Sequence, residues 1–144
     1  MNLKIIVFLL ALLIPWSASV ACDTNRAEWM LIHNTIITGQ YRDVLQEEKE
    51  LFAKTKECFA AAEGEETDNG HCKAFMGASI DEIGPKKKQL LQKFEKEAEA
   101  IWRLGCASLS KISEEVELAI GRLKESIKDL EKTKRRLERK EFLI

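Results

Sequence analysis

Four cysteines constrain the fold of this chain more than any other feature of its sequence. They stand at positions 22, 58, 72 and 106. In an oxidising compartment, an even number of cysteines in a small protein predicts disulfides, and four cysteines allow three pairings. The sequence contains no CxxC pair and no Cys/His cluster, so we expect structural disulfides, no metal and no cofactor. The pairing that forms depends on whether the chain is exported and on how its helices run.

The N-terminal segment has the features of a cleaved secretory signal peptide. Lys4 supplies the positive charge, and residues 5–14 form an apolar run. Small residues, Ser19 and Ala21, stand three positions and one position before the expected cleavage site, which precedes Cys22. Two alternatives remain open. An uncleaved membrane anchor would need about 20 apolar residues, and lipidation of the cysteine would resemble a bacterial lipoprotein only loosely.

We therefore divide the chain into a signal peptide, residues 1–21, and a single helical domain, residues 22–144, that is secreted or periplasmic. A domain of this size can bury a core of its own. Residues 23–84 contain 6 basic and 13 acidic side chains, whereas residues 85–144 contain 16 basic and 11 acidic ones. Opposite charges in the two halves can lie against each other within one molecule, and the overall balance argues against a nucleic-acid partner.

Apolar residues at seven-residue spacing predict a long first helix, from about residue 24 to about 62. The stripe comprises Met30, Ile37, Val44, Leu51 and Cys58. Asn25 followed by Glu28 is a candidate N-terminal cap for this helix. The polar segment 63–70 is expected to be a loop.

Two interruptions are expected in the helical sequence after that loop. A short helix over residues 72–82 should end at Gly84, because Pro85 begins a helix more readily than it continues one. The following helix should turn between Gly105 and Ser110, where glycine and serines suit a helix end and a new start. An unbroken helix through this segment is the alternative, since one internal glycine costs only about 1 kcal/mol.

The first helix excludes one pairing of the cysteines. Cys22 and Cys58 would lie about 54 Å apart at 1.5 Å per residue, whereas a disulfide requires about 6 Å between α-carbons. Folding the chain back at the loop places Cys58 opposite Cys72. Cys22 then lies 36 positions before Cys58, and Cys106 lies 34 positions after Cys72, so the two arms of the hairpin have nearly the same length. We predict the disulfides Cys22–Cys106 and Cys58–Cys72.

A second stripe with seven-residue spacing lies in the last part of the chain and must be covered. Its members are Leu109, Val116, Leu123, Leu130 and Leu137. Burying each is worth about 1.5–3 kcal/mol, too much to leave them in water. We favour an all-α fold in which the disulfide-stapled hairpin is extended to an up-down-up three-helix bundle. The alternative is a long hairpin whose coiled-coil extension pairs with a second copy, giving a homodimer.

Sequence motifs for catalysis are missing. Two histidines occur, His33 on the first helix and His71 beside Cys72, and no nucleophile elbow, phosphate-binding loop or HExxH motif is present. We therefore expect no enzymatic activity and name no catalytic residue.

The expected interaction residues all lie in the last helix. They are the apolar stripe defined above and a basic cluster, Lys134, Arg135, Arg136 and Arg139. The cluster is expected to be a solvated helix end, with contact to a membrane surface or an acidic protein as the alternative. It lacks interleaved aromatic residues, which argues against nucleic acid. We expect a non-enzymatic extracytoplasmic interaction module, a scaffold, adaptor or inhibitor that binds another protein. The alternative is a small secreted carrier with an apolar ligand between its helices.

Overall fold

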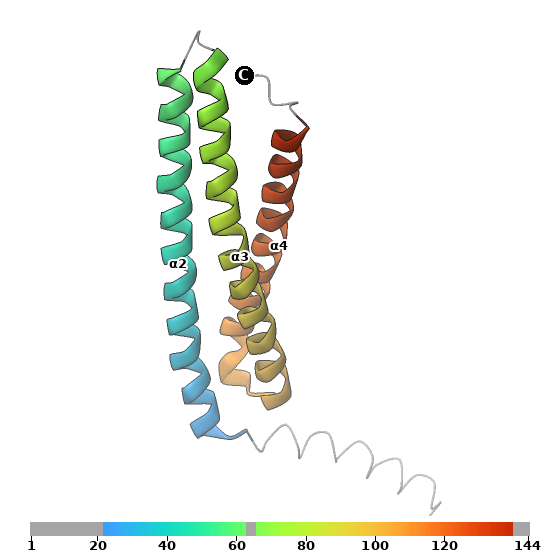
Figure 1. The fold of residues 1–144 in the computed structure, drawn as a ribbon. Helices are drawn as coiled ribbons and strands as arrows, with labels where there is room; N and C mark the ends of the chain where they lie inside the picture. The colour runs from blue at the N-terminus through green and yellow to red at the C-terminus, as the bar shows by residue number, and fades with distance from the viewer. Residues whose placement is uncertain (1–21, 63–65, 140–144) are drawn as a thin grey trace, which may run out of the picture.

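Three long helices make up the fold, and one of them packs against both others. The structure, a computed structural model, describes residues 22–62 and 66–139, so the predicted signal peptide lies outside the described residues. The helices, shown in Figure 1, are α2 (Thr24–Ala61), α3 (Glu66–Leu104) and α4 (Ser110–Glu138), with a short 3-10 helix, η1 (Ala107–Leu109), before α4. The described residues contain no strand. The predicted all-α, disulfide-stapled helical bundle is confirmed.

Both disulfides form as predicted and fix α2 against α3. The α-carbons of Cys22 and Cys106 are 5.3 Å apart, and those of Cys58 and Cys72 are 5.7 Å apart. The start of α2 therefore lies beside the end of α3, and the end of α2 beside the start of α3. The two helices run antiparallel over their whole length, as Figure 1 shows.

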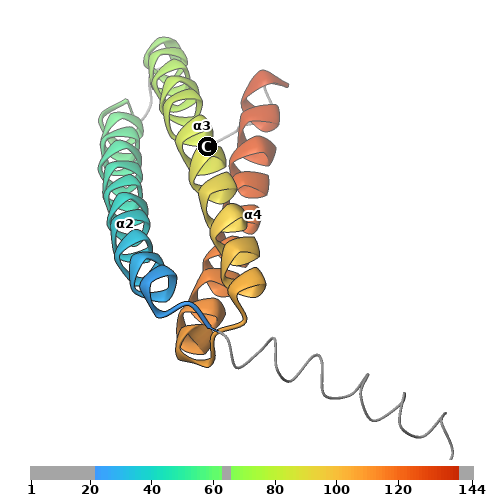
Figure 2. The ribbon, with the colours of Figure 1, turned by 90° about the horizontal axis from the view of Figure 1, so that it is seen from below.

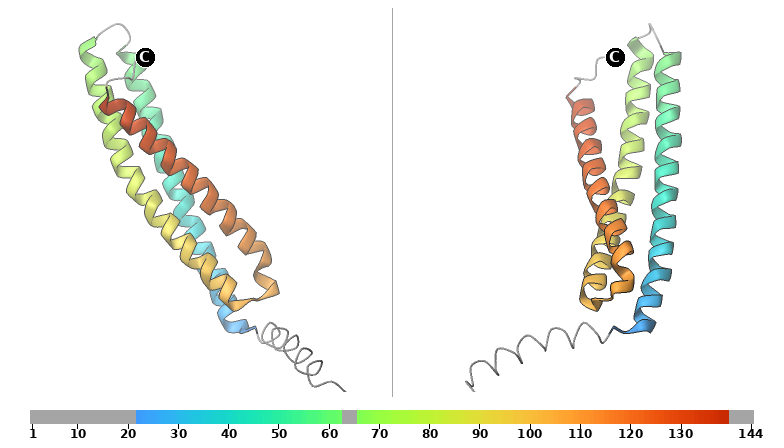
Figure 3. Two further views of the ribbon diagram at one scale, coloured as in Figure 1. Left: turned by 90° about the vertical axis from the view of Figure 1, so that its right-hand side faces the viewer. Right: turned by 180° about the vertical axis from the view of Figure 1, so that it is seen from behind.

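Helix α4 runs back along α3 rather than away from the molecule. Lys88 on α3 forms an ion pair of 3.2 Å with Glu131 on α4, and Asp81 forms another with Lys134. Toward the Cys58–Cys72 end, α3 lies between the other two helices, as Figure 2 and the right view of Figure 3 show. The backbone of α2 comes close to η1 at the Cys22–Cys106 end, and farther along the bundle α2 and α4 meet through side chains of the shared core. The long hairpin with a dimerising extension is therefore not the fold that forms.

The corner between α3 and α4 lies where the sequence predicts it. Helix α3 ends at Leu104, and Gly105 adopts a φ of 61°, a left-handed conformation that glycine tolerates without steric cost. The Gly105 N–H donates to the Ile101 carbonyl at 3.2 Å, which satisfies one carbonyl of the last turn. The chain then enters η1, and α4 begins at Ser110.

The predicted cap of the first helix is wrong by two residues. Asp23, not Asn25, is the N-cap: its Oδ1 accepts from the backbone N–H groups of Asn25 at 3.1 Å and Arg26 at 3.3 Å. Asn25 cannot cap, because the helix has already begun at Thr24 and a capping residue must have an extended backbone.

The predicted interruptions before residue 90 are also wrong, because α3 is continuous from Glu66 to Leu104. Residues 66–70 of the expected loop are helical, and Pro85 lies inside the helix. An internal proline costs about 3 kcal/mol. Ile83 and Leu90 are buried on either side of it, and keeping both in the core offsets this cost.

The core has a large apolar part, a small one, and a buried charge between them. The large cluster lies at the Cys22–Cys106 end and includes Phe94, Leu109 and Leu123. The small cluster lies toward the other end and consists of Ile80, Ile83 and Leu130. Between them Lys87, only 1% exposed, contacts Glu48 of α2 and Ser126 of α4. One buried ammonium group thus joins all three helices.

Candidate functional site

Helix α2 exposes a row of large apolar side chains outside its core-facing stripe. Trp29, Ile32 and Ile36 are 59%, 62% and 55% exposed. Their spacing of three and four residues places them on one face, beside the face that buries Met30 and Ile37. Isolated exposed apolar residues are normal, whereas a group on one helical face is a candidate interaction surface. We call Trp29, Ile32 and Ile36 the α2 apolar row.

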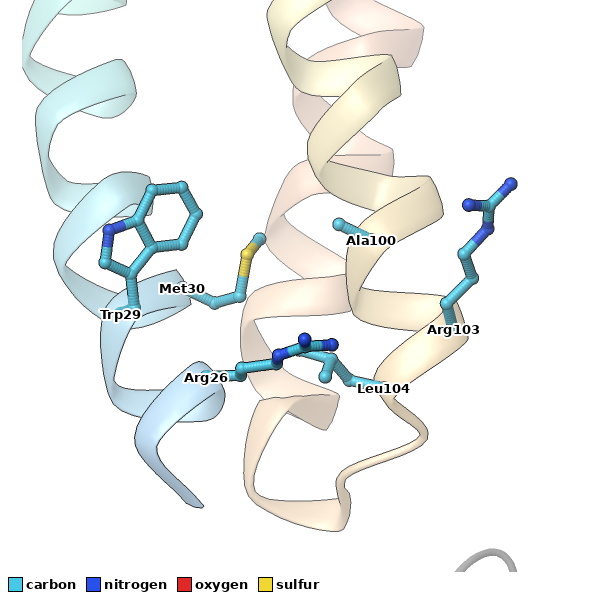
Figure 4. A pocket seen from close by; sticks show the side chains of 6 residues that line it. All are labelled: Arg26, Trp29, Met30, Ala100, Arg103 and Leu104. Atoms are coloured by element: carbon cyan, nitrogen blue, oxygen red, sulfur yellow. The ribbon is translucent and has the colours of Figure 1, made fainter. Parts of the chain in front are cut away.

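A hollow of about 450 Å³ lies next to this row, between α2 and α3. Its lining residues are Arg26, Trp29, Met30, Ala100, Arg103 and Leu104. Figure 4 shows the Trp29 indole and the Met30 side chain facing Ala100 across the groove. Since alanine contributes only a methyl group here, it leaves space that a larger side chain would fill. We call this space the α2–α3 hollow.

Two guanidinium groups lie at the rim of the hollow, and they point differently. Figure 4 shows the Arg26 guanidinium beside Leu104, whereas that of Arg103 points away from Trp29. Arg26 Nε is 3.6 Å from an Asp23 carboxylate oxygen, and Arg103 Nη2 is 2.5 Å from one of Glu99. Such exposed pairs contribute less than about 1 kcal/mol. A guanidinium carries five N–H donors, so each arginine retains donors for another acceptor.

A buried carboxyl and a half-buried imidazole lie one helical turn beyond the hollow. Glu97 is 2% exposed, and its carboxylate oxygens have no hydrogen-bond partner within the described ranges. Burial raises the pKa of Glu97, and the nearby Asn34 amide and His33 ring oppose part of this rise. His33 stacks on Trp29 with ring centroids 4.8 Å apart. The α2 apolar row thus adjoins a polar cluster that is costly to bury.

The structure corrects the expectation that the α4 stripe presents a partner-binding surface. Leu109, Val116, Leu123 and Leu130 are buried in the two core clusters, and Leu137 packs against the smaller one. The physical reason is the turn after Gly105, which brings α4 back onto α3. The stripe is covered by the chain's own helices and is not free for a second copy.

The basic cluster predicted near the C-terminus remains at the surface. Lys134 pairs with Asp81 of α3, which raises the pKa of the lysine. Arg135, Arg136 and Arg139 are exposed in the last turn of α4 and at its C-cap. Positive charge at this position complements the helix dipole. The structure does not bring these side chains near the α2 apolar row.

A second, smaller hollow of about 200 Å³ lies on the open side of the bundle, between α2 and α4. Phe94 and Tyr41 line it and meet edge to face at 5.7 Å between ring centroids. Burial raises the pKa of Tyr41. Arg122 and the exposed Leu118 of α4 line its other side. This hollow is less than half the volume of the one beside Trp29.

Residues 22–62 and 66–139 contain no group of three or more His, Cys, Asp or Glu side chains arranged to hold a metal ion. Within the same ranges, no helix combines the length and apolar character needed to cross a membrane.

Comparisons with known proteins identify no relative: no family model, no curated protein and no solved structure matches this chain.

The α2 apolar row is the feature that sequence reasoning missed. A signal was present, because Trp29 and Ile36 each precede a member of the predicted core stripe, Met30 and Ile37, by one residue. A helix that buries one stripe exposes a second stripe offset by about 100° unless another helix covers it. Only the placement of α3 and α4 decides which of the two is covered.

Proposed function

We propose that this protein is a non-enzymatic, extracytoplasmic interaction module that binds another protein through the α2 apolar row. The observation that carries the proposal is the exposure of Trp29, Ile32 and Ile36 on one helical face. Burying such side chains on binding is worth about 1.5–3 kcal/mol each. Tryptophan is also among the residues that contribute most to protein interfaces.

The site lies on a long helix close to a disulfide. The α2 apolar row begins seven residues after Cys22, whose disulfide to Cys106 fixes α2 against the α3 end. A surface that is already ordered loses little conformational entropy on binding. The disulfides are compatible with an oxidising, extracytoplasmic compartment.

Site-specific photo-crosslinking in the native fluid or extract tests this proposal. A photoreactive residue at position 32 is compared with one at position 45, because Leu45 is also exposed and lies on a different face of α2. We expect one discrete protein adduct from position 32 and none from position 45. Equal adducts from both positions would contradict the proposal.

The binding strength of the captured protein is then measured with two matched variants. We expect Ile32→Ser/Ile36→Ser to weaken binding by at least about tenfold. The control Leu31→Ser/Leu45→Ser, which removes two exposed leucines of the same helix, should leave the affinity within about twofold. Thermal unfolding of both variants checks that the bundle is intact.

A further inference from the structure

We propose that the α2–α3 hollow binds a long-chain carboxylate, with the alkyl chain in the hollow and the carboxylate held by Arg26. This inference goes beyond the proposed function, because it concerns a small ligand and does not require the α2 apolar row to bind a protein. Three observations carry it: the apolar lining, the volume, and the charge at the rim.

The lining suits an alkyl chain. Met30 is almost completely buried and forms the inner wall, Trp29 and Leu104 provide apolar sides, and Ala100 leaves the space open. The volume of about 450 Å³ falls within the range of small-molecule sites. Each methylene group that enters such a space is expected to raise affinity by about fourfold.

The rim favours an anionic headgroup at one end of the hollow. The Arg26 guanidinium lies beside Leu104, and the pair it forms with Asp23 uses only its Nε, at 3.6 Å. Its outer N–H groups match the two oxygens of a carboxylate. Beyond the other end of the hollow lies the buried Glu97 carboxyl, which offers no cation to a second negative group. The chemistry therefore fits a molecule with one anionic end and one apolar end.

A carboxylate free in solution and one seated in a bilayer present the same headgroup. We commit to the free monomer, because Arg26 and Arg103 are each paired with a carboxylate, which leaves the rim with little net positive charge to attract an anionic bilayer. A hollow of this volume also suits one chain rather than a bilayer edge.

The test uses the full mature chain and dodecanoate below its micellar concentration. Binding is followed by calorimetry and by Trp29 fluorescence in a Trp102→Phe background, since Trp102 is 82% exposed and lies outside the hollow. We expect saturable binding of one dodecanoate per chain, with affinity rising from octanoate to dodecanoate. Dodecanol and dodecyltrimethylammonium should bind at least about tenfold more weakly.

Two variants separate the hollow from the charge. Ala100→Leu fills the hollow and should lower affinity for dodecanoate and dodecanol alike, by at least about tenfold. Arg26→Gln should lower the affinity for dodecanoate by about tenfold and the affinity for dodecanol by less than about twofold. The matched control is Arg42→Gln, which removes an exposed arginine from the same helix and should change neither. Where Ala100→Leu perturbs unfolding, Ala100→Val provides a smaller filling.

Several outcomes would overturn the proposal. The first is no saturable dodecanoate binding up to about 1 mM. If Ala100→Leu binds dodecanoate with unchanged affinity, the hollow is not the binding site. If Arg26→Gln weakens the binding of dodecanoate and of dodecanol equally, Arg26 does not recognise the headgroup. Binding to vesicles that contain oleate, without binding to monomeric dodecanoate, would assign the site to a membrane surface instead.

Discussion

The two ends of the bundle differ in how they are stabilised. The Cys22–Cys106 end contains the large apolar cluster, with Phe94, Leu109 and Leu123 almost completely buried. The Cys58–Cys72 end contains the small cluster and has more ion pairs between helices, most of them exposed. These include Lys86–Glu47 at 2.7 Å, Lys88–Glu131 at 3.2 Å and Lys134–Asp81.

This difference supports placing both proposed binding sites at the Cys22–Cys106 end. The end with the large core also exposes the α2 apolar row and contains the α2–α3 hollow, so it has more apolar surface than its own helices cover. At the other end, charged side chains occupy the helix faces, and Lys86 lowers the pKa of Glu47 through their hydrogen bond. A solvated end of this kind offers little desolvation energy to a partner.

The largest effect is expected from a lysine placed in the large core. Leu123→Lys should lower the free energy of unfolding by more than about 5 kcal/mol, because it removes a fully buried side chain and leaves a charge without a partner. Leu130→Lys, in the small cluster, should cost less because the longer side chain can reach water. Urea unfolding measures both, with Glu125→Lys as the surface control. If both variants lose the same free energy of unfolding, the two ends do not differ in how strongly their cores stabilise the bundle.

The two disulfides should contribute unequally. Cys22 and Cys106 are separated by 84 residues, and Cys58 and Cys72 by 14. Restriction of the unfolded chain predicts a loss of about 4.5 kcal/mol on removing the first disulfide and about 3 kcal/mol on removing the second. The comparison uses Cys22→Ser/Cys106→Ser and Cys58→Ser/Cys72→Ser in thermal unfolding. The reverse order would show that the loop length does not dominate.

The buried lysine between the ends provides a third test. Lys87→Met leaves Glu48 without its ammonium partner and should cost about 3 kcal/mol. The double variant Lys87→Met/Glu48→Leu should recover most of that loss, because no unpaired charge remains. Lys88→Met, which removes the neighbouring exposed lysine, should change stability by less than about 1 kcal/mol. A double variant as unstable as the single one would mean that Lys87 stabilises the bundle through more than this pair.

The smallest effect is a gain in stability from Glu97→Gln. The pKa of Glu97 is raised in the folded state, so the folded chain binds more protons than the unfolded chain above the ordinary glutamate pKa of about 4.3. Wild-type stability from this group is therefore present at low pH and falls as pH rises through the folded-state pKa. Glutamine should remove that fall and add about 1–2 kcal/mol at pH 7. The free energies of unfolding of the wild type and of Glu97→Gln are measured between pH 4 and 8. If the two curves run parallel over this range, the prediction is wrong.

Much of the fold follows from spacing alone. Met30 to Cys58 and Leu109 to Leu137 keep one phase over four heptads each, so the helical content and the buried faces could be predicted. The cysteine pairing also followed, because a helix is too rigid to let Cys22 meet Cys58. The corner at Gly105 was predictable because the local sequence itself supplies the left-handed residue.

Local signals failed where distant packing outweighed them. Pro85 predicts a break, yet α3 continues because residues on both sides of it are buried against the other helices. The α4 stripe, which was offered as an interaction surface, is buried for the same reason, whereas the basic cluster remains exposed and its role stays a prediction.

The sequence by itself determined the first and last helices, their buried faces and the disulfides, because these depend on periodicity and on chain geometry. Only the tertiary structure decided which apolar residues remain exposed on the surface of the bundle. Helix α4 covers its own stripe by turning back onto α3, and Trp29, Ile32 and Ile36 on α2 remain exposed. The tertiary structure also brings Ala100 opposite Trp29 and Met30 across a hollow, because residues 71 and 70 positions apart in the sequence become neighbours only when the helices pack.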